Sequence, residues 1–550
     1  YAAKKEGDTN SIQITDESFY QPPVLTKTWF HTGAFLEKEK ILRQFADEYF
    51  QNTAFAEYHL PDAVIELPEG MLLSDFSVTE YREALRACKS MPIRTEVYAL
   101  DGTDHEPIPY TTAETNANIQ LLQAQGENRH AVFLVKESEA ITYHYERNSA
   151  DPRIAHKLNL KIDDIGDIKK SAAVVYPRVA IPQDLPAGVQ KEQAKQHIVY
   201  SENEYTNDIG SLWDDSRDFR HRELCEAKTY ELTGAKPEND FFQLEELRQA
   251  TERATELEYQ QSTTAGAVEK RLIEHVRTLF MDIDDPNEAF KQPLPWKQQN
   301  RLGLAYESYQ LAFTSGLLSD LYGDKVSEQM LSDGQYLSSA QRKAEGWFPS
   351  EDADGLWWDH EETVQYAYAD TPADHFYMPN QYCDPYGYCS KIDYDSYHLF
   401  VTRTEDARQN TTAVERFNYR TLQPERVKDE NDNLTEVAFD TLGMVVGMAL
   451  IGKDKTDPAY TPDAGDDLEG FEADLTSGQI DTFFRDPLAN GLALLGHATS
   501  RFVYDFSTAP IKVATINREV HWHAPGGEHS PLQYAFAYSN GLGQVMLQKV

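Results

Sequence analysis

The stretch VAFDTLGMVVG occupies residues 437–447 and has the pattern of a β-hairpin. Two short apolar runs flank the turn Asp-Thr-Leu-Gly at residues 440–443, so extended chain is predicted on both sides of a tight reversal. Gly443 is expected to adopt a positive φ angle, where a side chain would cost about 1–2 kcal/mol. The stretch therefore predicts a hairpin in which the glycine has a structural role.

Related turns recur along the chain. Asp-x-x-Gly is found again at residues 163–166 and 384–387, and a looser copy, Tyr-Ser-Asn-Gly-Leu-Gly, occupies residues 538–543. Their spacing is irregular, which argues against a propeller or solenoid of fixed period. The recurrence instead predicts a long winding sheet built from many unequal hairpins.

The composition is that of a folded protein rich in β-sheet. Of the 550 residues, 40% are hydrophobic and 26% are charged, which does not fit a disordered chain. The 31 tyrosines outnumber the 25 phenylalanines, and a chain rich in tyrosine and turns favours sheets with half-exposed faces. The length alone would allow three or four domains, although all-β architectures often run longer as single units.

The chain is strongly acidic, with 51 Lys and Arg against 91 Asp and Glu and a formal charge of −40. Such a chain repels nucleic acid and anionic lipid, so neither is expected as a partner. The acidity suits either solubility, including a high-salt source, or a negative surface that handles a basic or unfolded partner. No run of 18 apolar residues is present, so no direct membrane insertion is predicted.

We expect the sequence to be a piece of a longer chain. It starts at Tyr1 without a charged-then-apolar leader, and it both begins and ends in the middle of a pattern.

Four cysteines are too few for a disulfide framework. Cys88 and Cys225 are expected to be buried thiols. Cys383 and Cys389 bracket the turn at residues 384–388, where a hairpin could bring them together. The sequence leaves open whether these two form a disulfide or remain free.

Two groups of histidines were considered as metal ligands. His375 and His398 are too distant from the cysteine pair to give a tight ligand spacing. His521, His523 and His529 form a better cluster, because His-x-His on a strand puts both rings on one face. Apart from an adjacent glutamate, no nearby carboxylate or thiol completes this set. We therefore predict neither a metal site nor a cofactor.

The first third of the chain has the pattern of a sheet with a few short helices. Residues 22–33 predict a strand ending at a glycine turn, residues 37–50 and 79–91 predict helices, and residues 94–100 predict a strand. Further strands are predicted at residues 119–122, 131–135, 141–145, 158–162 and 172–176.

Between residues 186 and 345 the apolar pattern changes to helical spacing, which predicts a helix-rich insertion lying on the sheet. Apolar stripes mark residues 244–257, 268–279 and 306–313, and Pro-Leu-Pro-Trp at 293–296 interrupts them. From residue 346 the strand pattern resumes, with an aromatic window at 347–377 and an acidic loop at 454–479. The strands expected in this part cover residues 398–402, 414–419, 437–450, 492–506 and 511–522.

No catalytic motif emerges, and the chain is predicted to be non-enzymatic, with no catalytic residue. A Walker loop, a Rossmann glycine pattern, a nucleophile elbow and a His-Glu-x-x-His motif are all absent from the sequence. For an ADP-ribosyltransferase the order is wrong, because the Glu-x-Glu pairs at 202–204 and 256–258 precede Ser-Thr-Thr at 262–264. Pairs of carboxylates for glycoside hydrolysis carry no signal among 91 acids.

Seven stretches closely resemble the B component of bacterial insecticidal Tc toxin complexes, and the match runs in order from about residue 22 to residue 550. They are KTWFHTG (27–33), RTEVYALDG (94–102), NRHAVF (128–133), ITYHYER (141–147), TYELTG (229–234), KRLIEHVR (270–277) and YESYQLAF (306–313).

The resemblance covers the middle and later part of the family, after its β-propeller. It implies a mainly β fold, a large curved antiparallel RHS/YD-repeat sheet that forms part of a hollow shell. Together with the change to helical spacing, it predicts four parts: a linker and post-propeller segment (1–110), sheet strands (111–185), the helix-rich insertion (186–345) and the repeat shell (346–550).

The function implied by the resemblance is that of a secreted, structural part of a toxin complex. In the family, the B component and a C component form a β-cocoon that encapsulates a toxic effector. A propeller docks the cocoon onto the A component, a pentameric translocation channel. The self-cleaving aspartyl site belongs to the C component, so Asp384 and Asp395, which lie in turns, are not assigned to it.

The chain departs from the family pattern at Cys383, Cys389 and Met444, which weakens inferences about individual repeat contacts. Two other functions were weighed. One is a cell-surface adhesin or carbohydrate-binding module that uses aromatic residues such as Trp357, and the other, the weakest, is a hydrolase.

Overall fold

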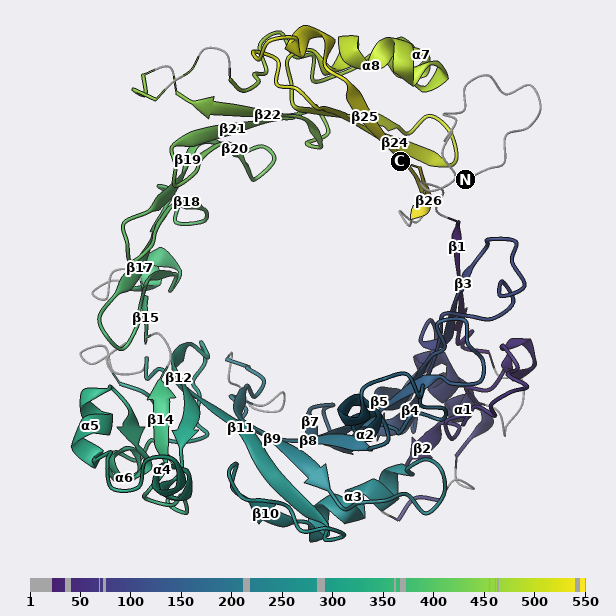
Figure 1. Cartoon of the computed structure of the whole chain (residues 1–550), viewed down its shortest axis with the longest axis vertical. Coiled ribbons are helices and arrows are strands. Elements are labelled where there is room, and N and C mark those ends of the chain that lie inside the picture. The colour runs from purple at the N-terminus through teal and green to yellow at the C-terminus, as the bar shows by residue number, and fades with distance from the viewer. Residues whose placement is uncertain are drawn as a thin grey trace. The chain divides into compact units, whose positions relative to one another are not determined.

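The computed structural model of the chain describes residues 22–34, 41–68, 70–72, 76–210, 218–283, 292–360, 363–366, 372–454, 456–459, 461, 464–539 and 545–549. These residues form two compact units, one within residues 21–362 and the other within residues 363–550. Each unit is built on its own sheet, and both sheets are antiparallel except for two short parallel strand pairs in the first unit (Figure 1). The expectation of a mainly β fold is confirmed.

The first unit contains a 14-stranded sheet in which most neighbours in sequence are also neighbours in space, in the order β1-β3-β4-β5-β6-β7-β8-β9-β11-β12-β14-β13, with β2 beside β4 and β10 beside β11. The strands are β1 (Val24–Phe30), β2 (Val64–Glu66), β3 (Pro92–Ala99), β4 (Thr111–Gln123), β5 (Val132–His144), β6 (Arg153–Ile162), β7 (Ile168–Val175), β8 (His197–Tyr205), β9 (Leu224–Thr233), β10 (Thr255–Leu257), β11 (Glu269–Phe280), β12 (Ala305–Phe313), β13 (Leu337–Ser338) and β14 (Trp357–His360).

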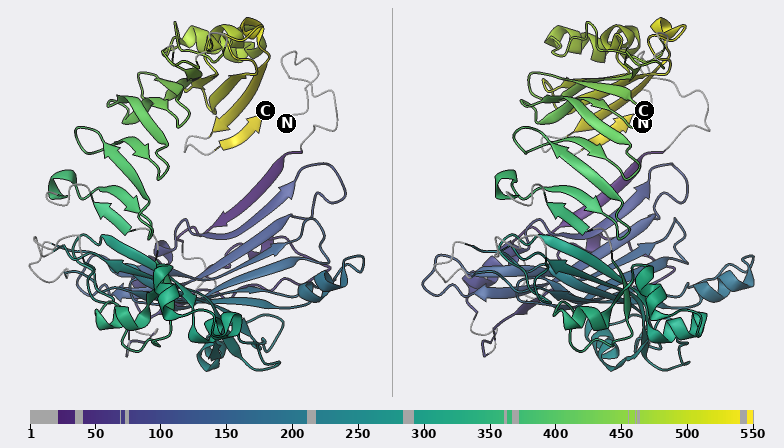
Figure 2. Two further views of the ribbon diagram at one scale, coloured as in Figure 1. Left: turned by 60° about the vertical axis from the view of Figure 1, so that its left-hand side comes forward. Right: turned by 90° about the vertical axis from the view of Figure 1, so that its left-hand side faces the viewer.

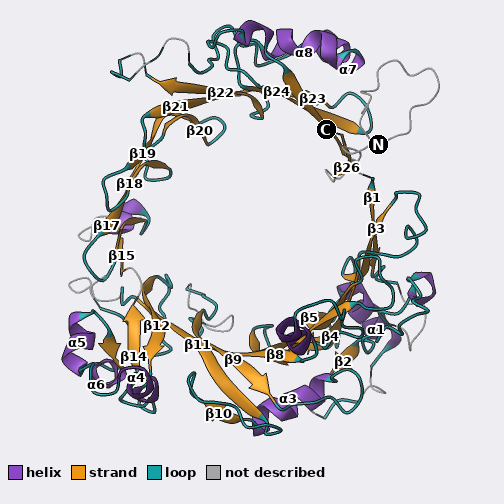
Figure 3. Cartoon of the chain, in the orientation of Figure 1, coloured by secondary structure: helices purple, strands orange, loops and turns teal. Residues whose placement is uncertain are grey.

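Short helices accompany this sheet (Figure 3). They are the 3-10 turn η2 (Ala46–Glu48), α1 (Val78–Ala87), α2 (Ala187–Gln193), α3 (Leu244–Arg253), α4 (Ser315–Tyr322), α5 (Glu328–Asp333) and α6 (Ser339–Ala344). Helix α1 packs on β5 through Ala84 and Leu85, and α3 packs on β6 through Leu247 and Ala250. The apolar stripes of these helices are therefore packing faces of the sheet's core.

The second unit is a 12-stranded meander in which the strands follow one another in sequence order from β15 to β26 (Figure 2). Helices α7 (Ser477–Arg485) and α8 (Pro487–Leu495) separate β22 from β23 and pack on β23 and β24 around Phe483 and Val503. The strands are β15 (Thr363–Tyr366), β16 (Pro379–Cys383), β17 (Cys389–Tyr394), β18 (Val401–Glu405), β19 (Thr411–Asn418), β20 (Gln423–Lys428), β21 (Asn433–Phe439), β22 (Val445–Lys453), β23 (Ser500–Asp505), β24 (Ile511–Arg518), β25 (Leu532–Ser539) and β26 (Val545–Lys549); η4 (Pro372–His375) and η5 (Gly527–His529) are single 3-10 turns.

The hairpin predicted at residues 437–447 is confirmed as β21 and β22. Gly443 has a φ angle of 88°, and its N–H donates to the Asp440 carbonyl at 3.0 Å. Asp440 Oδ1 accepts a hydrogen bond from the Met444 N–H at 2.8 Å, so the aspartate closes the turn. The turns at 163–166 and 384–387 repeat this arrangement, whereas residues 540–543 of the looser copy lie outside the described residues.

Further turns of the same kind are not marked by glycine. Asp406 and Asp429 also begin five-residue turns, and the fourth positions, Gln409 and Asp432, have φ angles of 68° and 61°. The next residues, Asn410 and Asn433, donate from their side chains to these aspartates at 2.7 and 3.0 Å. Aspartate at the first position is therefore the more general marker of the hairpin turns.

Replacing Gly443 by alanine is expected to destabilise the second unit by about 1–2 kcal/mol, because alanine is strained at positive φ. Gly478→Ala is the matched control: this glycine lies in α7, does not have a positive φ and has open space around its Cβ position. The control is expected to be neutral or to stabilise by up to about 1 kcal/mol. Urea unfolding followed by circular dichroism measures both, and equal effects would contradict the assigned role of Gly443.

The prediction of a helix-rich insertion at residues 186–345 is partly wrong. Residues 244–253 form α3 as expected, but the stripes at 268–279 and 306–313 are strands β11 and β12. The inward positions of β11 include His275 and Arg277, both buried. Because polar residues occupy buried positions, the apolar pattern does not alternate and resembles a helix.

Smaller differences concern residues 37–50 and 492–506. In the described part of the first range the only helical turn is η2, because Asp62 binds the backbone N–H groups of Ile41 and Leu42 at 2.8 and 2.7 Å and holds this segment as a loop. In the second range residues 492–495 end helix α8, which Pro487 and the Asp486 side chain begin, and the strand starts at Ser500.

Candidate functional site

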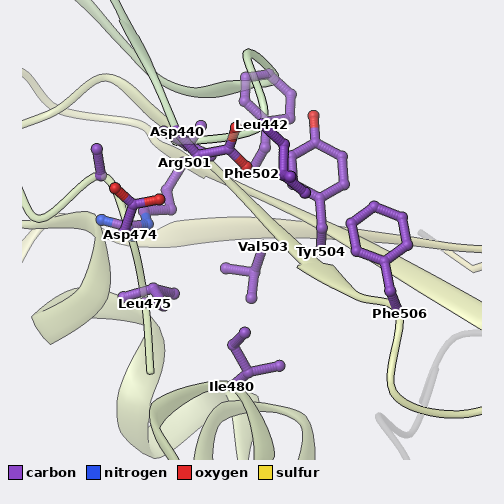
Figure 4. Close-up of a pocket in the computed structure, with 12 residues that line it drawn as sticks. Asp440, Leu442, Asp474, Leu475, Ile480, Arg501, Phe502, Val503, Tyr504 and Phe506 are labelled. Atoms are coloured by element: carbon purple, nitrogen blue, oxygen red, sulfur yellow. The ribbon is translucent and has the colours of Figure 1, made fainter. Parts of the chain in front are cut away.

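A pocket lies beside the β21–β22 hairpin. It has a volume of about 190 Å³ and is formed where the β21–β22 turn, the segment before α7, and β23 meet (Figure 4). Its lining residues are Asp440, Leu442, Val446, Ala473, Asp474, Leu475, Ile480, Arg501, Phe502, Val503, Tyr504 and Phe506.

The walls of the pocket are largely apolar. Val446 and Val503 are buried, whereas Leu442 and Phe506 are exposed at its mouth. The rings of Tyr504 and Phe506 lie parallel, with centroids 6.1 Å apart, and the Tyr504 hydroxyl donates to the Val445 carbonyl at 2.8 Å. The two rings therefore provide a fixed aromatic surface (Figure 4).

Arg501 contributes a buried cation to the pocket. Its side chain is 1% exposed; Nη1 donates to the Leu494 carbonyl at 3.2 Å and Nη2 to the Glu472 carbonyl at 2.6 Å. The guanidinium lies 4.2 Å from the centroid of the Phe471 ring. Burial lowers the pKa of Arg501 to about 10, which still leaves the side chain charged at neutral pH.

Two carboxylates lie at the pocket's edge. Asp440 closes its own turn, and Asp474 accepts the Thr441 N–H at 2.8 Å. That hydrogen bond lowers the pKa of Asp474. The lining residues thus combine apolar side chains, the buried Arg501 and two carboxylates, and they contain no paired nucleophile and base.

The cysteine question is answered by a disulfide between Cys383 and Cys389, which joins β16 to β17 with a Cα–Cα distance of 4.0 Å. A metal site using these thiols is therefore excluded. Cys88 and Cys225 are buried as predicted, and burial raises the pKa of their thiols to about 11 and about 12.

Alkylation of the denatured chain with iodoacetamide is expected to modify two cysteines without reductant and all four after reduction. Intact-mass measurement distinguishes the two counts. Four modified cysteines in the unreduced, oxidised protein would contradict the disulfide. Cys383→Ser is expected to cost about 2 kcal/mol, because the bond closes only a short loop.

The predicted histidine cluster is an acid–histidine network. His521 Nδ1 contacts Asp466 Oδ2 and His523 Nε2 contacts Asp467 Oδ2, each at 2.8 Å. His497 Nδ1 contacts Asp467 Oδ1 at 2.9 Å. These contacts connect the acidic loop to the segments before β23 and after β24. The described residues contain no group of His, Cys, Asp or Glu side chains that could hold a metal ion.

His529 is 84% exposed and lies apart from this network. His375 and His398 contact one another through their Nδ1 atoms at 3.0 Å. The sequence did not reveal Asp466 and Asp467 as the partners of His521 and His523, because 55 and 56 positions separate the paired residues along the chain.

Aromatic residues at 347–358 of the window are buried or half-buried, whereas Phe376 is 61% exposed and residues 361–362 and 367–371 lie outside the described residues. Trp358 and Phe348 are buried, their rings are 5.1 Å apart, and Trp357 is 8% exposed. The guanidinium of Arg277 lies 4.6 Å from the Trp358 ring centroid and 4.9 Å from that of Phe348. These side chains therefore do not offer the exposed platform that the glycan-binding alternative requires.

The remaining candidate acids have structural contacts. Glu202 and Glu256 each lie 3.2 Å from Lys270 Nζ. Asp384 and Asp395 close hairpin turns, and Asp395 also accepts the Tyr419 hydroxyl at 2.9 Å.

Residues 262–264, considered for ADP-ribosyl transfer, lie exposed in a loop. Among the helices that the structure describes, none is long and apolar enough to cross a membrane.

Sequence and structure comparisons both identify relatives. Residues 83–213 match the family described as the insecticide toxin TcdB middle/C-terminal region, while no curated protein matches the sequence. The chain spans about a quarter of the length of the solved chains that it matches.

In the crystal structure of TcdB2-TccC3, the match covers 96% of this chain and 24% of the other, with a TM-score of 0.54 and 19% identity. In the crystal structure of TcdB2-TccC3-TEV, the match covers 98% of this chain and 26% of the other, with a TM-score of 0.55 and 17% identity. In the structure of the Photorhabdus luminescens Tc holotoxin pore, the match covers 96% of this chain and 26% of the other, with a TM-score of 0.54 and 18% identity. Residues 83–213 thus resemble the TcdB middle/C-terminal region, and the chain has the fold seen in the TcdB2-TccC3 structures.

Proposed function

We propose that the chain is a non-enzymatic wall segment of a secreted bacterial toxin complex. In this proposal it forms part of a β-cocoon that, together with a C component, encapsulates a toxic effector. Delivery then proceeds through an A-component channel, which is contacted by a propeller outside the present sequence. Neither nucleic acid nor direct membrane insertion has a part in this function.

The observation that carries the proposal is the pair of long antiparallel sheets. Strands β15 to β26 pair in sequence order without interruption, and the same fold occurs in structures of TcdB2-TccC3 and of a Tc holotoxin pore. A wide meander satisfies its backbone hydrogen bonds in ladders and can enclose space without a filled centre. In the proposal, residues 1–110 are a post-propeller linker, 111–185 the first sheet strands, 186–345 an insertion with short helices, and 346–550 the repeat shell.

The proposal assigns no catalytic residue to the chain. Its candidate acids and histidines serve turns, ion pairs and loop anchoring, as the contacts of Asp395, Lys270 and Asp467 illustrate. These contacts favour a structural role over the hydrolase. Burial of Trp357 and Trp358 likewise disfavours the adhesin.

Protease protection tests encapsulation directly. The complete B protein is co-expressed with its C component, and the effector region is probed by limited proteolysis with and without the B protein. The expected result is that the effector survives only in the assembled complex. Equal cleavage in both samples, with complex formation verified by size-exclusion chromatography, would count against a cocoon.

A further inference from the structure

One end of the second sheet carries exposed apolar side chains on four hairpin turns. These turns connect β17 to β18, β19 to β20, β21 to β22 and β23 to the antiparallel β24, and because neighbouring strands alternate in direction, all four lie at the same end. Their large apolar side chains, which are 47–74% exposed, are Tyr397, Leu399, Tyr419, Leu422, Leu442 and Phe506. We call these six side chains the apolar rim.

The apolar rim is not a general property of the hairpin turns in this sheet. The two turns that alternate with them along the chain, at residues 406–410 and 429–432, lie at the opposite end. Their only apolar residue is Ala407, and the others are Asp, Glu, Asn, Gln and Arg. The two ends of the sheet therefore differ in the surface that they offer to a partner.

Direct contacts join the four turns into one continuous surface. The rings of Tyr397 and Tyr419, on the first two turns, have centroids 5.6 Å apart. Arg420 of the second turn donates to two backbone carbonyls of the third at 2.6 and 2.9 Å. Leu442 of the third turn and Phe506 of the fourth line the same pocket. Long exposed apolar surfaces of this kind mark interaction sites.

The area of the apolar rim suits one side of a dimer. If a large side chain presents roughly 200 Å² when fully exposed, the six side chains at 47–74% exposure present on the order of 600–700 Å². A stable interface buries about 800 Å² on each partner. The apolar rim therefore supplies most of the area that one copy must contribute, and the backbone of the turns can supply the rest.

The charges of this surface favour a second copy of the chain. With a formal charge of −40, most surfaces of the chain repel a copy. Here both signs are present: Arg420 donates to carbonyls, Asp474 accepts the Thr441 N–H, and neither side chain forms an ion pair within the part of the chain that the structure describes. A surface with charges of both signs can be complementary to itself across a twofold axis.

We propose that the chain forms a twofold-symmetric dimer through the apolar rim. The axis passes through the β21–β22 turn, so Leu442 packs against Leu442 of the second copy. The flanking turns then pair in opposite order, with Leu422 against Phe506 of the copy and Arg420 against Asp474 of the copy. This interface goes beyond the proposed wall function and does not rest on it.

Sedimentation velocity of the full chain over a range of concentrations and NaCl levels tests the dimer. A monomer–dimer equilibrium is expected that tightens as salt is added, because screening weakens the repulsion between two acidic chains. Leu442→Glu is expected to weaken the dimer about tenfold or more, since it places like charges at the axis. Ala407→Glu adds the same charge at an exposed position of the opposite end and should dimerise as well as Ala407→Gln.

A single cysteine tests the position of the axis. The native cysteines are buried or joined in the disulfide, so mild oxidation with copper phenanthroline is expected to link Leu442→Cys into a covalent dimer and to leave the control Ala407→Cys monomeric. Circular dichroism verifies the fold of each variant. The proposal is overturned if the wild-type chain stays monomeric up to about 100 µM at every salt level, which would mean that another occupant covers the apolar rim. It is also overturned if Leu442→Glu dimerises as tightly as wild type, or if the two cysteine variants are linked equally.

Discussion

Arg94→Met is expected to lower the free energy of unfolding of the first unit by about 3–5 kcal/mol, because it leaves buried carboxylates without their cation. Arg94 is 1% exposed and contacts three carboxylates: Glu57 at 2.8 Å, Glu96 at 3.0 Å and Glu114 at 3.3 Å. Burial alone would lower the pKa of Arg94, but these carboxylates raise it above its usual value. The cluster joins the loop before β2 to strands β3 and β4.

Urea unfolding followed by tryptophan fluorescence measures this effect in the first unit, since Trp522 is the only tryptophan after residue 363. Arg153→Met provides the control. Arg153 pairs with Glu146 at the surface, where both side chains are more than half exposed, so the loss is expected to be below about 1 kcal/mol. Equal midpoints for wild type and Arg94→Met would refute the role given to Arg94.

Acidification is expected to weaken the first unit through His275. Burial lowers the pKa of His275 to about 4, against an ordinary value of about 6.5. Between these pH values the unfolded chain binds a proton at this site and the folded chain does not, so stability falls as the pH falls. Between pH 7.5 and 4.5 the loss amounts to about 2–3 kcal/mol.

The neighbouring acid does not cancel this effect. Burial alone would raise the pKa of Glu226, but the hydrogen bond from His275 at 2.7 Å and the charge of Arg277 lower it to about 2. Glu226 therefore remains ionised to well below pH 4, and its own contribution is lost only as the pH falls from about 4 toward 2.

The variant His275→Gln can preserve a donor to Glu226 without titrating. Between pH 7.5 and 4.5, its unfolding free energy is expected to fall by about 2–3 kcal/mol less than that of wild type. His529→Gln, at an exposed position, should retain the wild-type dependence. If His275→Gln and wild type have parallel pH profiles, His275 is not the group responsible.

The hairpin architecture could be predicted from the sequence wherever an aspartate and a glycine mark the same turn, as at Asp440 and Gly443. The turns that place Gln409 and Asp432 in the left-handed region carry no glycine at that position, so the Asp-x-x-Gly pattern does not mark them. Their signal was present in another form. An asparagine four residues after the aspartate donates to it in both turns, so Asp-x-x-x-Asn could have located them.

The prediction of helices in β11 and β12 failed for a different reason. In β11 the buried positions include His275 and Arg277, and in β12 they include Glu307. Hydrophobic periodicity assumes that inward side chains are apolar, and it misassigns a strand whose inward side chains include buried polar residues. The cation–π contacts of Arg277 with Trp358 and Phe348 depend on residues about 70 to 80 positions away, so no local pattern shows them.

The candidate pocket could not be located from the sequence. Asp440, Asp474 and Arg501 come from a hairpin turn, a loop and a strand, and only the fold brings them to one pocket. Arg501 is separated by 27 and 61 positions from Asp474 and Asp440 in the sequence, so no local pattern joins the three residues.

Electron cryo-microscopy of the complete protein assembled with its C component tests the central claim most directly. The account predicts that residues 22–549 form curved β-sheet wall around a cavity, with β15 to β26 following one another along it. A compact particle with a filled interior, or sheets that face solvent on both sides, would contradict it.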